Sequence, residues 1–504
     1  MNTEDIFKTI GTVASKQKTD IFVVGGYVRD QLLGRGDTKD LDFVVDGSGI
    51  GFAKVFFEQF DAENVRLIEF PDFDTARVLF VEERARVIDR FDEPEPIPGV
   101  EKKSEEQVFD IMTLFEVEFA GARKETYDSA SRKPKVVATS IEDDLSRRDF
   151  TVNAMAQKVL ADGNLGDVID PFGGQKDLET RTLRTPLDPN ETFSDDPLRM
   201  MRAARFASQL IFEIEQKTYM AMKRNAVRLK IVSQERIQEE LMKLLATVKP
   251  SIGLWILYKT ELFDQFMPEV SDLAGVEEVA GYSHKDNLSH TFAVVDNIAE
   301  QSDNTLLRFA GLMHDIAKPS VKQFEKGRGW TFDMHEHLGR KMVREIGTRF
   351  RMSKRDIEYV AKLVRWHLQP IAVMDKKVTD APVRRLVVNL KHDLQELLYL
   401  CRADITTGNQ KKKEHRLRNY DILEQRIREV MAKDKLRAFQ SPLRGEEIME
   451  LCGLKAGPTV GKIKKRIEDA ILDGEIPNEY ASAKVFFDRI KDEYVNMAGE
   501  WEKL

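Results

Sequence analysis

The sequence has little cysteine and no long apolar run, and these absences exclude several classes of protein. Cys401 and Cys452 are its two cysteines in 504 residues, too few for a disulfide framework or a cysteine-rich zinc site. No stretch approaches the roughly 18 uncharged apolar residues of a membrane helix, and the first residues lack the basic and apolar regions of a signal peptide. We therefore expect a cytoplasmic protein with no membrane partner and no evident obligate protein partner.

The chain also lacks an excess of positive charge. It has 78 Lys and Arg against 86 Asp and Glu, a net charge of −8, which argues against coating nucleic acid by bulk charge. Two stretches are nevertheless basic: residues 411–437 hold ten Lys or Arg and five Asp or Glu, and residues 222–236 hold five and one. A solvated helix face explains such stretches about as well as contact with an RNA backbone.

The pattern of apolar residues changes along the chain. Residues 21–24, 41–45, 75–81 and 115–119 are predicted strands, and residues 27–33 a short helix that stops at Gly34. Beyond about residue 190 the 3–4 spacing of apolar residues predicts helices, including 235–245 and the tail after residue 406. Residues 81–107 are rich in charge and contain three closely spaced prolines, so the middle of this segment is predicted to be an exposed loop.

A first group of chemically competent residues lies in VGGYVRDQLLGRGDTKDLDFVV, residues 24–45. Asp40 and Asp42 are two apart at the start of a strand, so both carboxylates point to one face and suit a hard cation such as Mg²⁺. Gly25 and Gly26 expose backbone N–H groups at a strand–helix turn, where a triphosphate can bind. Together these features predict metal-assisted nucleotidyl transfer.

This segment resembles the nucleotide-binding signature of class II tRNA nucleotidyltransferases and bacterial poly(A) polymerases, within the polymerase-β superfamily. The resemblance continues through ARKETY (122–127), DDLSRRDFTVNAMA (143–156), DPFGGQKDL (170–178), DDPLRMMRAARFA (195–207) and ERIQEELMKLL (235–245). It implies an α+β fold whose polymerase-β-like catalytic domain, a small sheet with helices, spans residues 1–160. An all-α neck and body that bind the nucleobase and RNA follow at 161–275.

The resemblance also implies roles for individual residues. Asp40 and Asp42 hold the catalytic Mg²⁺, with Glu118 as the third acidic residue; the family often has Asp there, Glu116 lies on the same strand face, and a structural ion pair is the alternative for Glu118. Asp196 and Arg199, three apart on a helix, hydrogen-bond the Watson–Crick edge of the base. The other implied nucleotide contacts are Gly25, Gly26, Arg29, Arg147, Arg148, Asp149, Asn153 and Arg202.

A second group consists of histidines and aspartates in a fixed order. Burying an adjacent His-Asp pair in an apolar helix is costly unless it is ligated or paired, and imidazole with a bridging carboxylate suits transition metals. The order resembles the HD domain of metal-dependent phosphohydrolases, here at residues 280–405, and His337 is a rival to its third histidine. The implied ligands of a divalent transition metal or Mg²⁺ are His290, His314, Asp315, His335, His367 and Asp404.

The expected function is template-independent addition of CCA to tRNA 3′ ends from CTP and ATP, with residues 406–504 as a helical tail that contacts tRNA. Poly(A) addition, or addition of CC or A alone, stays open, and residues 81–107 lie where the restricted enzymes differ. HD domains beside nucleotidyltransferases include phosphatases, phosphodiesterases and structural modules. The hypothesis from another class is an HD phosphohydrolase whose N-terminal half binds RNA without catalysis.

Overall fold

The computed structural model describes residues 2–36, 39–61, 63–86, 108–126, 135–138, 140–276, 278–279, 282–283, 286–374, 379–434 and 441–498. The chain forms two compact units, Met1–Asp272 with Arg349–Arg351, and Leu273–Thr348 with Met352–Leu504. The finer division at residues 160, 275 and 405 stays a prediction. In the described part of the chain no helix combines the length and apolar character that crossing a membrane requires.

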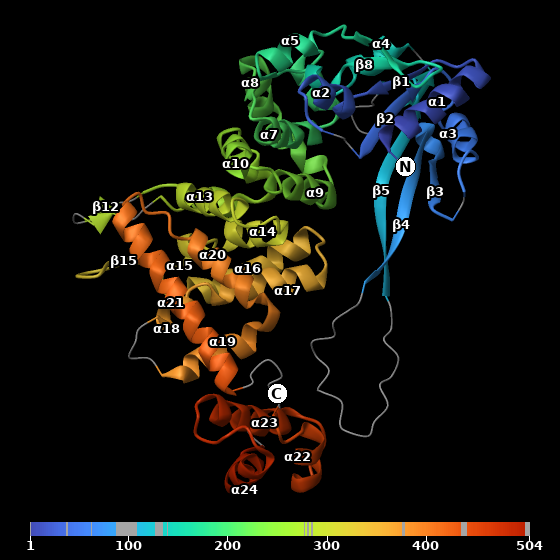
Figure 1. The fold of residues 1–504 in the computed structure, drawn as a ribbon. Helices are drawn as coiled ribbons and strands as arrows, with labels where there is room; N and C mark the ends of the chain where they lie inside the picture. Colours follow the sequence, from blue (N-terminus) through green and yellow to red (C-terminus); the bar gives the residue numbers. More distant parts are fainter. Residues whose placement is uncertain are drawn as a thin grey trace. The chain divides into compact units, whose positions relative to one another are not determined.

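One seven-stranded sheet organises the first unit (Figure 1). Its order is β3-β4-β5-β2-β1-β8-β9, and every neighbouring pair is antiparallel except β2 with β5. The parallel pair places the start of β2 beside Glu116 in the middle of β5. The strands are β1 (Ile21–Val24), β2 (Asp40–Val45), β3 (Val65–Phe70), β4 (Thr75–Arg86), β5 (Val108–Gly121), β8 (Ala156–Val159) and β9 (Leu165–Ile169).

Strands β4 and β5 are longer than the sequence predicts. Residues 81–86 pair with 108–113, past the residues of these strands that pair with β3 and β2, so the two strands continue as a two-stranded ribbon. Residues 82–86, EERAR, show no apolar alternation, which is why the prediction stopped at residue 81. The first six residues of the 81–107 segment are therefore strand, and its middle, predicted to be an exposed loop, lies outside the described residues.

Aromatic side chains form the core beneath this sheet. Phe43 of β2 stacks on Phe119 of β5 at 5.5 Å between ring centroids. Helix α3 (Gly49–Phe57) contributes Phe52 and Phe56, whose rings lie 5.2 and 5.1 Å from Phe119. The ring of Phe7 on α1 (Thr3–Gln17) lies 5.4 Å from Phe43. This packing fixes the backbone of β2 and β5, whose polar side chains on the opposite face form the site below.

Helices make up most of the rest of the first unit, as the apolar spacing predicts. Two small sheets accompany them, β6 (Arg123–Thr126) with β7 (Lys135–Ala138) and β10 (Thr182–Leu183) with β11 (Glu213–Ile214). Helix α7 packs against α9 and α10. At Gly253 of α10 an added Cβ would lie 2.6 Å from the Ala204 carbonyl oxygen of α7, so glycine permits this close approach. The helices are α2 (Gly26–Leu32), α4 (Ile141–Ser146), α5 (Gly174–Glu179), α6 (Pro189–Asp195), α7 (Leu198–Leu210), α8 (Gln216–Asn225), α9 (Gln234–Leu245), α10 (Pro250–Lys259), α11 (Phe263–Phe266) and α12 (Pro268–Ser271).

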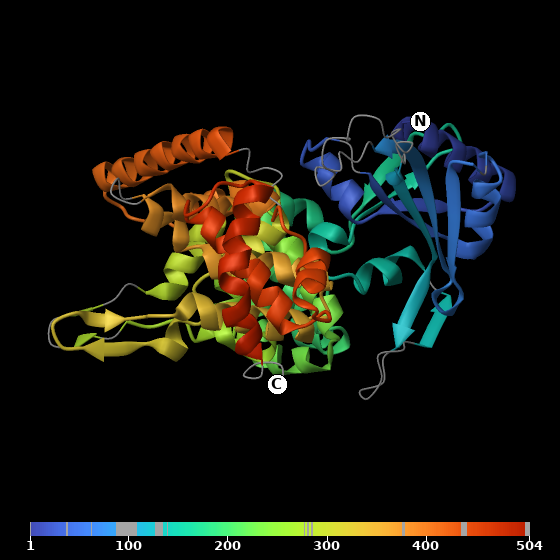
Figure 2. The ribbon, with the colours of Figure 1, turned by 90° about the horizontal axis from the view of Figure 1, so that it is seen from below.

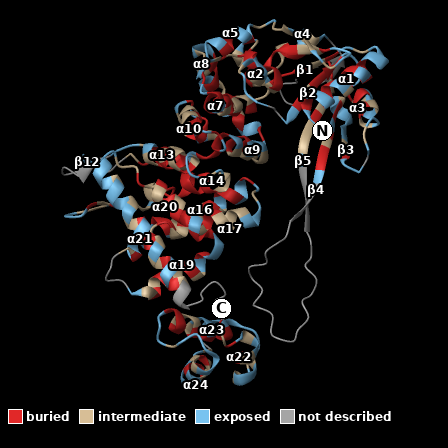
Figure 3. Ribbon diagram, in the orientation of Figure 1, coloured by how far each residue is buried: buried red, intermediate tan, exposed pale blue. Residues whose placement is uncertain are grey.

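The second unit is almost entirely helical, with buried faces turned inward (Figure 3). A short hairpin of β14 (Gln323–Glu325) and β15 (Gly329–Thr331) interrupts it. The helices around the histidines are α13 (Asn287–Ala299), α14 (Thr305–Met313), α15 (Lys318–Val321), α16 (His335–Arg349), α17 (Lys354–Trp366), α18 (Gln369–Val373), α19 (Asp380–Leu390) and α20 (Leu394–Ala403).

The tail after residue 406 is helical, as predicted. Helix α21 (Gln410–Asp434) is one long helix (Figure 2) that buries Tyr420, Leu423, Ile427 and Val430. This 3–4 spacing leaves most of its basic residues on the exposed side. Three further helices share their own apolar core: α22 (Gly445–Cys452), α23 (Pro458–Leu472) and α24 (Tyr480–Asn496).

Candidate functional site

Four carboxylates share one face of the sheet where β2 begins. Asp40 and Asp42 are two residues apart on β2, so their side chains lie on the same face. The parallel register places Glu116 of β5 beside Asp40 and Glu118 beside Asp42. Arg77 of β4 donates to Glu118 Oε2 at 2.6 Å and lies 3.0 Å from Glu116 Oε1. The structural ion pair that was the alternative for Glu118 is therefore present, with Arg77. Of the four carboxylates, Asp40 and Asp42 line the cavity described below.

The electrostatics of this group favour a bound cation. Burial, followed by the charges of Asp40 and Glu118, raises the pKa of Asp42 to about 7, and the nearby guanidinium of Arg148 offsets only part of this. Burial and Glu118 also raise the pKa of Asp40. Neighbouring carboxylates disfavour each other's ionised form. A divalent cation that takes oxygen ligands stabilises the ionised form of both. The residues present therefore fit the metal that this family implies.

The glycine turn before α2 is shaped by close contacts. Gly25 has φ +71, and an added Cβ would lie 2.9 Å from Arg148 Nη1 and 3.7 Å from Asp42 Oδ2. A side chain here would be strained in its backbone and would displace the guanidinium. The buried Nε of Arg148 has no hydrogen-bond partner among the described residues. The turn thus carries an incompletely satisfied cation beside the carboxylates, which suits an anionic ligand.

A chain of buried polar contacts supports the turn from behind. Arg29 donates from Nη1 to Asn153 Oδ1 at 2.7 Å, and Asn153 Nδ2 donates to Asp149 Oδ1 at 3.0 Å. Arg202 of α7 donates from Nε to Asp149 Oδ2 at 2.7 Å. Burial works against the Asp149 charge, yet Arg202 and the Asn153 hydrogen bond lower its pKa to about 2. Asp149 therefore anchors an arginine and an asparagine at the cavity wall.

Asp196 and Arg199 do not lie on one helix, which corrects the sequence-based expectation. Asp196 has extended backbone, with φ −134 and ψ 100, and Pro197 caps α7, so the helix begins only at Leu198. The Asp196 carboxylate accepts from Leu198 N at 3.1 Å and from Arg236 Nη2 at 3.2 Å. Arg199 donates from Nη2 to the Arg147 carbonyl at 2.6 Å. The two side chains still meet at the same cavity.

A cavity of about 730 Å³ unites these residues, a size within the usual range for small-molecule sites. Every predicted catalytic or nucleotide-binding residue lines it except Glu118. Those residues are Gly25, Gly26, Arg29, Asp40, Asp42, Arg147, Arg148, Asp149, Asn153, Asp196, Arg199 and Arg202.

Sequence reasoning missed one wall of the cavity, the polar face of α9. Arg236, Glu239, Glu240 and Lys243 recur at 3–4 residue spacing and line the cavity, opposite the buried leucines of the same helix. That spacing was visible in ERIQEELMKLL and would have identified the face. The remaining lining residues outside the prediction are Asp30, Leu198, Arg205, Phe206 and Gln209.

Two of these α9 residues act on the rest of the site. The buried Glu240 accepts from Arg205 Nε at 2.8 Å, which ties α9 to α7. Burial raises the pKa of Asp40, and the positive charge of Lys243 offsets part of this rise. The Lys243 ammonium group therefore stabilises the ionised form of this metal-binding carboxylate. Lys243 thus contributes positive charge beside the Asp40 carboxylate.

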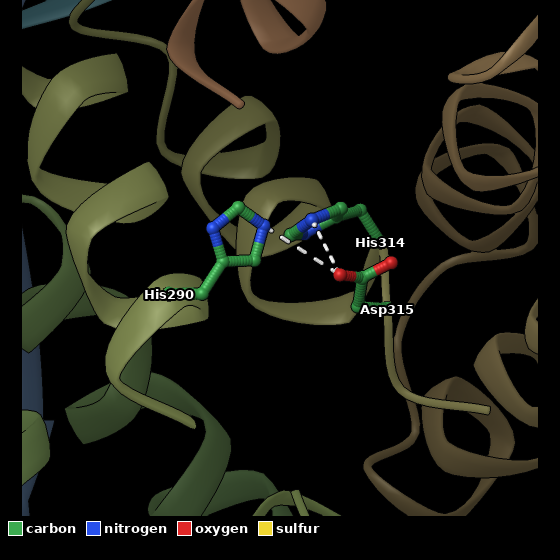
Figure 4. Close-up of side chains that lie close together, drawn as sticks. All are labelled: His290, His314 and Asp315. Carbon is green, nitrogen blue, oxygen red and sulfur yellow. Dashed lines mark ion pairs between the residues drawn. The ribbon is translucent and has the colours of Figure 1, made fainter. Parts of the chain in front are cut away.

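The second unit gathers the six predicted HD residues into one cluster. Asp315 lies at its centre: Oδ2 is 3.2 Å from His314 Nε2 and 3.6 Å from His290 Nε2 (Figure 4), while Oδ1 is 3.3 Å from His335 Nε2 and 3.9 Å from His367 Nε2. Asp404 Oδ1 is 2.9 Å from His290 Nε2. Among the described residues, His290 with His314 and Asp315, and Asp315 with His335 and His367, have donor atoms close enough to share a metal ion.

The outer nitrogen of each ring is anchored, which directs the other nitrogen inward. The Nδ1 atoms of His314, His335 and His367 each lie 2.7 Å from the backbone carbonyl oxygen three residues earlier. His290 Nδ1 instead lies 2.7 Å from the Thr406 hydroxyl. Such partners commonly orient metal-binding histidines. His337, the alternative to His335, has a side chain 46% exposed and pairs with Glu336 outside the cluster.

The charges of this cluster also fit a metal. Burial, helped by the His314 charge, lowers the pKa of His367 to about 4, so this ring is neutral and able to ligate at pH 7. Burial opposes ionisation of Asp315, but His314 and Lys318 hold its pKa well below the ordinary value. Burial likewise opposes protonation of His314, but Asp315 and Asp404 outweigh it and raise the pKa of that ring. A proton here compensates buried negative charge, a role that a metal ion also fills.

Comparisons with known proteins place both halves of the chain in known families. Three family models match: the poly A polymerase head domain at residues 21–108 and 95–184, the probable RNA and SrmB- binding site of polymerase A at 211–273, and the HD domain at 287–409. The A-adding tRNA nucleotidyltransferase of Deinococcus radiodurans is 32% identical over 366 residues, which cover 70% of this chain and 80% of that protein.

Two further comparisons extend this result. The CC-adding tRNA nucleotidyltransferase of Thermus thermophilus is 31% identical over 347 residues, covering 67% of this chain and 74% of that protein. The crystal structure of the Bacillus stearothermophilus CCA-adding enzyme with CTP shares the α+β fold, with a TM-score of 0.64 and 21% identity over 98% of this chain and 100% of that one. The chain therefore belongs to the tRNA nucleotidyltransferase family that shares the poly(A) polymerase head domain, and it also carries an HD domain.

Proposed function

We propose that this protein adds C, C and A to the 3′ end of tRNA, using CTP, ATP and Mg²⁺. The observation that carries the proposal is the single cavity that joins the Asp40/Asp42 face, the Gly25 turn, and Asp196 with Arg199. These three groups of residues can bind a metal ion, a triphosphate and a base, respectively. The relatives' names divide among A-adding and CC-adding enzymes, so the sequence of additions is the part of the proposal that needs direct measurement.

Each side of the cavity has its own task in this proposal. Bound Mg²⁺ supplies Lewis-acid activation of the attacking hydroxyl and stabilises the leaving pyrophosphate. Asp40 and Asp42 hold that ion, and Glu118 keeps the field negative beside them. Gly26 and Arg148 receive the triphosphate with a backbone N–H group and a guanidinium. The N–H of Gly25 donates to the Met155 carbonyl, and the missing side chain at Gly25 leaves room for the Arg148 guanidinium.

Base selection rests on the opposite wall. Asp196 accepts and Arg199 donates, the two kinds of group needed to hydrogen-bond the edge of a cytosine or adenine base. Both are held by the protein itself, through Arg236 and the Arg147 carbonyl, so the protein presents a defined pattern without a nucleic-acid template. Arg202, fixed by Asp149, supplies further charge beside them.

The rest of the chain holds the RNA and a second activity. We assign residues 1–160 to catalysis, 161–275 to the nucleobase and RNA, 280–405 to the HD domain, and 406–504 to tRNA contact through the exposed basic face of α21. The histidine cluster favours a phosphatase or phosphodiesterase activity in the HD domain, because it presents inward-facing nitrogens on two sides of Asp315. Its ligands suit a divalent transition metal or Mg²⁺.

The decisive experiment is nucleotide addition to tRNA that ends at the discriminator base, resolved to single nucleotides. We expect two additions with CTP alone and a third when ATP is also present. A long ladder with ATP alone identifies a poly(A) polymerase, and two additions without a third identify a CC-adding enzyme. A second substrate, tRNA that already ends in CC, completes the assay. Addition of a single A to this tRNA, with no addition to the shorter one, identifies an A-adding enzyme.

Paired variants separate the two sites. Asp40→Ala and Asp42→Ala should abolish incorporation, whereas His314→Ala and Asp315→Ala should leave it intact. If the Asp40 and Asp42 variants incorporate nucleotides normally, the assignment of the head site is wrong. If wild type incorporates nothing, the HD domain becomes the working site of the protein.

A further inference from the structure

The two metal-binding carboxylates of the head cavity lie at different distances from the glycine turn. In the register of β1 with β2, Asp42 pairs with Val24, the last strand residue before Gly25. Asp40 lies two residues nearer the start of β2, past the end of β1, which is roughly 7 Å farther along the strand. Asp42 therefore marks the triphosphate side of the metal site, and Asp40 marks the side away from it.

A different cation stands beside each carboxylate. Arg148, at the glycine turn, acts on Asp42, whereas the charges of Arg77 and Lys243 act on Asp40. Arg77 is engaged by the two β5 carboxylates, and it is not among the residues that line the cavity. Among the described residues of the cavity wall, Lys243 is thus the cation on the Asp40 side.

The protein holds this lysine only weakly. The Lys243 side chain is 60% exposed, and its Nζ lies 3.9 Å from Glu240 Oε1, near the limit of an ion pair. The other carboxylate oxygen of Glu240 accepts from Arg205 Nε at 2.8 Å, so that acid already has a closer cation. The Lys243 ammonium group can therefore move toward a ligand on its flexible stem without breaking a strong contact.

Helix α9 separates this lysine from the part of the cavity that meets the base. Arg236, which contacts Asp196, and Lys243 are seven residues apart and both line the cavity, a separation of about 10 Å along the helix. The incoming nucleotide occupies the base wall at one end and the glycine turn across the metal. The Lys243 end of the α9 face is left for the other substrate.

The geometry of nucleotidyl transfer says where that substrate enters. The oxygen of the primer's 3′ hydroxyl bonds to the α-phosphorus as the α–β anhydride bond breaks and pyrophosphate leaves. The attacking and leaving oxygens lie roughly in line, so a pyrophosphate at the glycine turn requires a primer that arrives from the Asp40 side. The nearest negative charge to that hydroxyl is the last phosphodiester of the RNA, which an ammonium group at the entrance can contact.

We propose that Lys243 positions the primer: its ammonium group binds the last phosphodiester of the tRNA and thereby holds the 3′ hydroxyl on the Asp40 side of the metal site. This inference rests on the proposed function, because it takes Asp40 and Asp42 as the metal ligands and the glycine turn as the triphosphate site. It assigns Lys243 to the RNA strand and not to the incoming nucleotide.

Steady-state kinetics test this assignment first. Lys243→Met removes the charge and keeps the length of the side chain. We expect kcat/KM for tRNA to fall about tenfold, the size of one charge-assisted contact at an exposed site, while KM for the nucleotide stays unchanged. Lys243→Arg should retain most of the activity. A raised KM for the nucleotide with normal tRNA kinetics overturns the proposal and places Lys243 on the triphosphate.

A matched control removes an exposed lysine elsewhere in the same unit. Lys259 of α10 lies outside the cavity lining, with its Nζ 5.7 Å from the Trp255 ring, so Lys259→Met should behave as wild type. If it lowers kcat/KM for tRNA as much as Lys243→Met does, the effect belongs to net charge and the proposal is wrong.

The decisive test neutralises the phosphate instead of the lysine. The substrate is whichever tRNA the wild type extends, ending at the discriminator base or in CC, made with a methylphosphonate at its last linkage. Wild type should lose about tenfold in kcat/KM on this substrate, and Lys243→Met less than about twofold, because the contact is already absent. Equal losses in the two proteins overturn the proposal. The choice of tRNA tests the proposed function, and the ratio of losses tests Lys243, so the two failures are distinguishable.

A pH series excludes a purely electrostatic role of the lysine. If Lys243 only kept Asp40 ionised, the activity of Lys243→Met would recover as the pH rises, equally with both linkages. We expect the defect to persist between about pH 7 and 9, where the lysine of the wild type stays charged, and recovery at the upper end contradicts the primer contact.

Discussion

Replacing Asp42 with asparagine should stabilise the metal-free protein while destroying its activity. The carboxyl group has a pKa of about 7 in the folded protein and about 4 when unfolded. Below about pH 4 it is neutral in both states. Between about pH 4 and 7 only the unfolded chain loses the proton, so stability falls with rising pH, and above 7 the loss is complete.

The size of this effect follows from the shift. Three pKa units correspond to about 4 kcal/mol, and solvent in the open cavity reduces this, so we expect Asp42→Asn to gain about 1–2 kcal/mol at pH 8. For a unit of this size the gain amounts to a rise of about 2–6 °C in melting temperature. The gain should shrink toward zero as the pH falls to about 4.

Calorimetric unfolding in EDTA at pH 5 and pH 8 measures this directly. Saturating Mg²⁺ should reverse the order, because wild type gains about 2.7 kcal/mol at 100 times its Kd and the variant gains little. Asp149→Asn is the matched control: the pKa of Asp149 is held near 2 by Arg202, so its loss should destabilise at pH 7 by about 2–3 kcal/mol. Asp42→Asn that is no more stable than wild type at pH 8 in EDTA would refute the electrostatic argument.

Two further substitutions probe how ligand-facing groups are held. Arg236→Gln removes the 3.2 Å contact to Asp196 and should lower kcat/KM for CTP and ATP about fivefold each, the value of a half-exposed ion pair; unchanged kinetics, with Arg236→Lys as the conservative comparison, would remove this residue from base positioning. Thr406→Val deletes the partner of His290 Nδ1 and should weaken Mn²⁺ binding at the HD cluster about 10–100-fold. Thr407→Val, a neighbour without that contact, should bind normally, and equal affinities of the two variants would contradict the anchoring role.

The sequence predicts the parts of the head site that depend on local spacing. Alternation along a strand placed Asp40 and Asp42 on one face, and the pair of glycines marked the turn before α2. The partner of Glu118 was not predictable in this way, because Arg77 meets it only through the antiparallel register of β4 with β5. Such register depends on packing between distant segments rather than on local pattern.

Two differences between prediction and structure have local signals in the sequence. Pro197 fixes the start of α7, and it should have excluded Asp196 from the helix. The polar residues of α9 recur every three or four positions, as clearly as its leucines do, yet only the apolar set was interpreted. In the HD domain the order of histidines identified the cluster, whereas the pairing of Asp315 with both halves required the fold.

The backbone anchors of the HD histidines affect how this site tolerates sequence change. Three rings take their orientation from a carbonyl of the preceding turn, and no substitution can delete a carbonyl. The orientation of His335 and His367 therefore does not depend on the side chain of a second residue. The His290 half depends on a hydroxyl side chain, so drift in related chains should erode that half first and leave a single-ion remnant around Asp315.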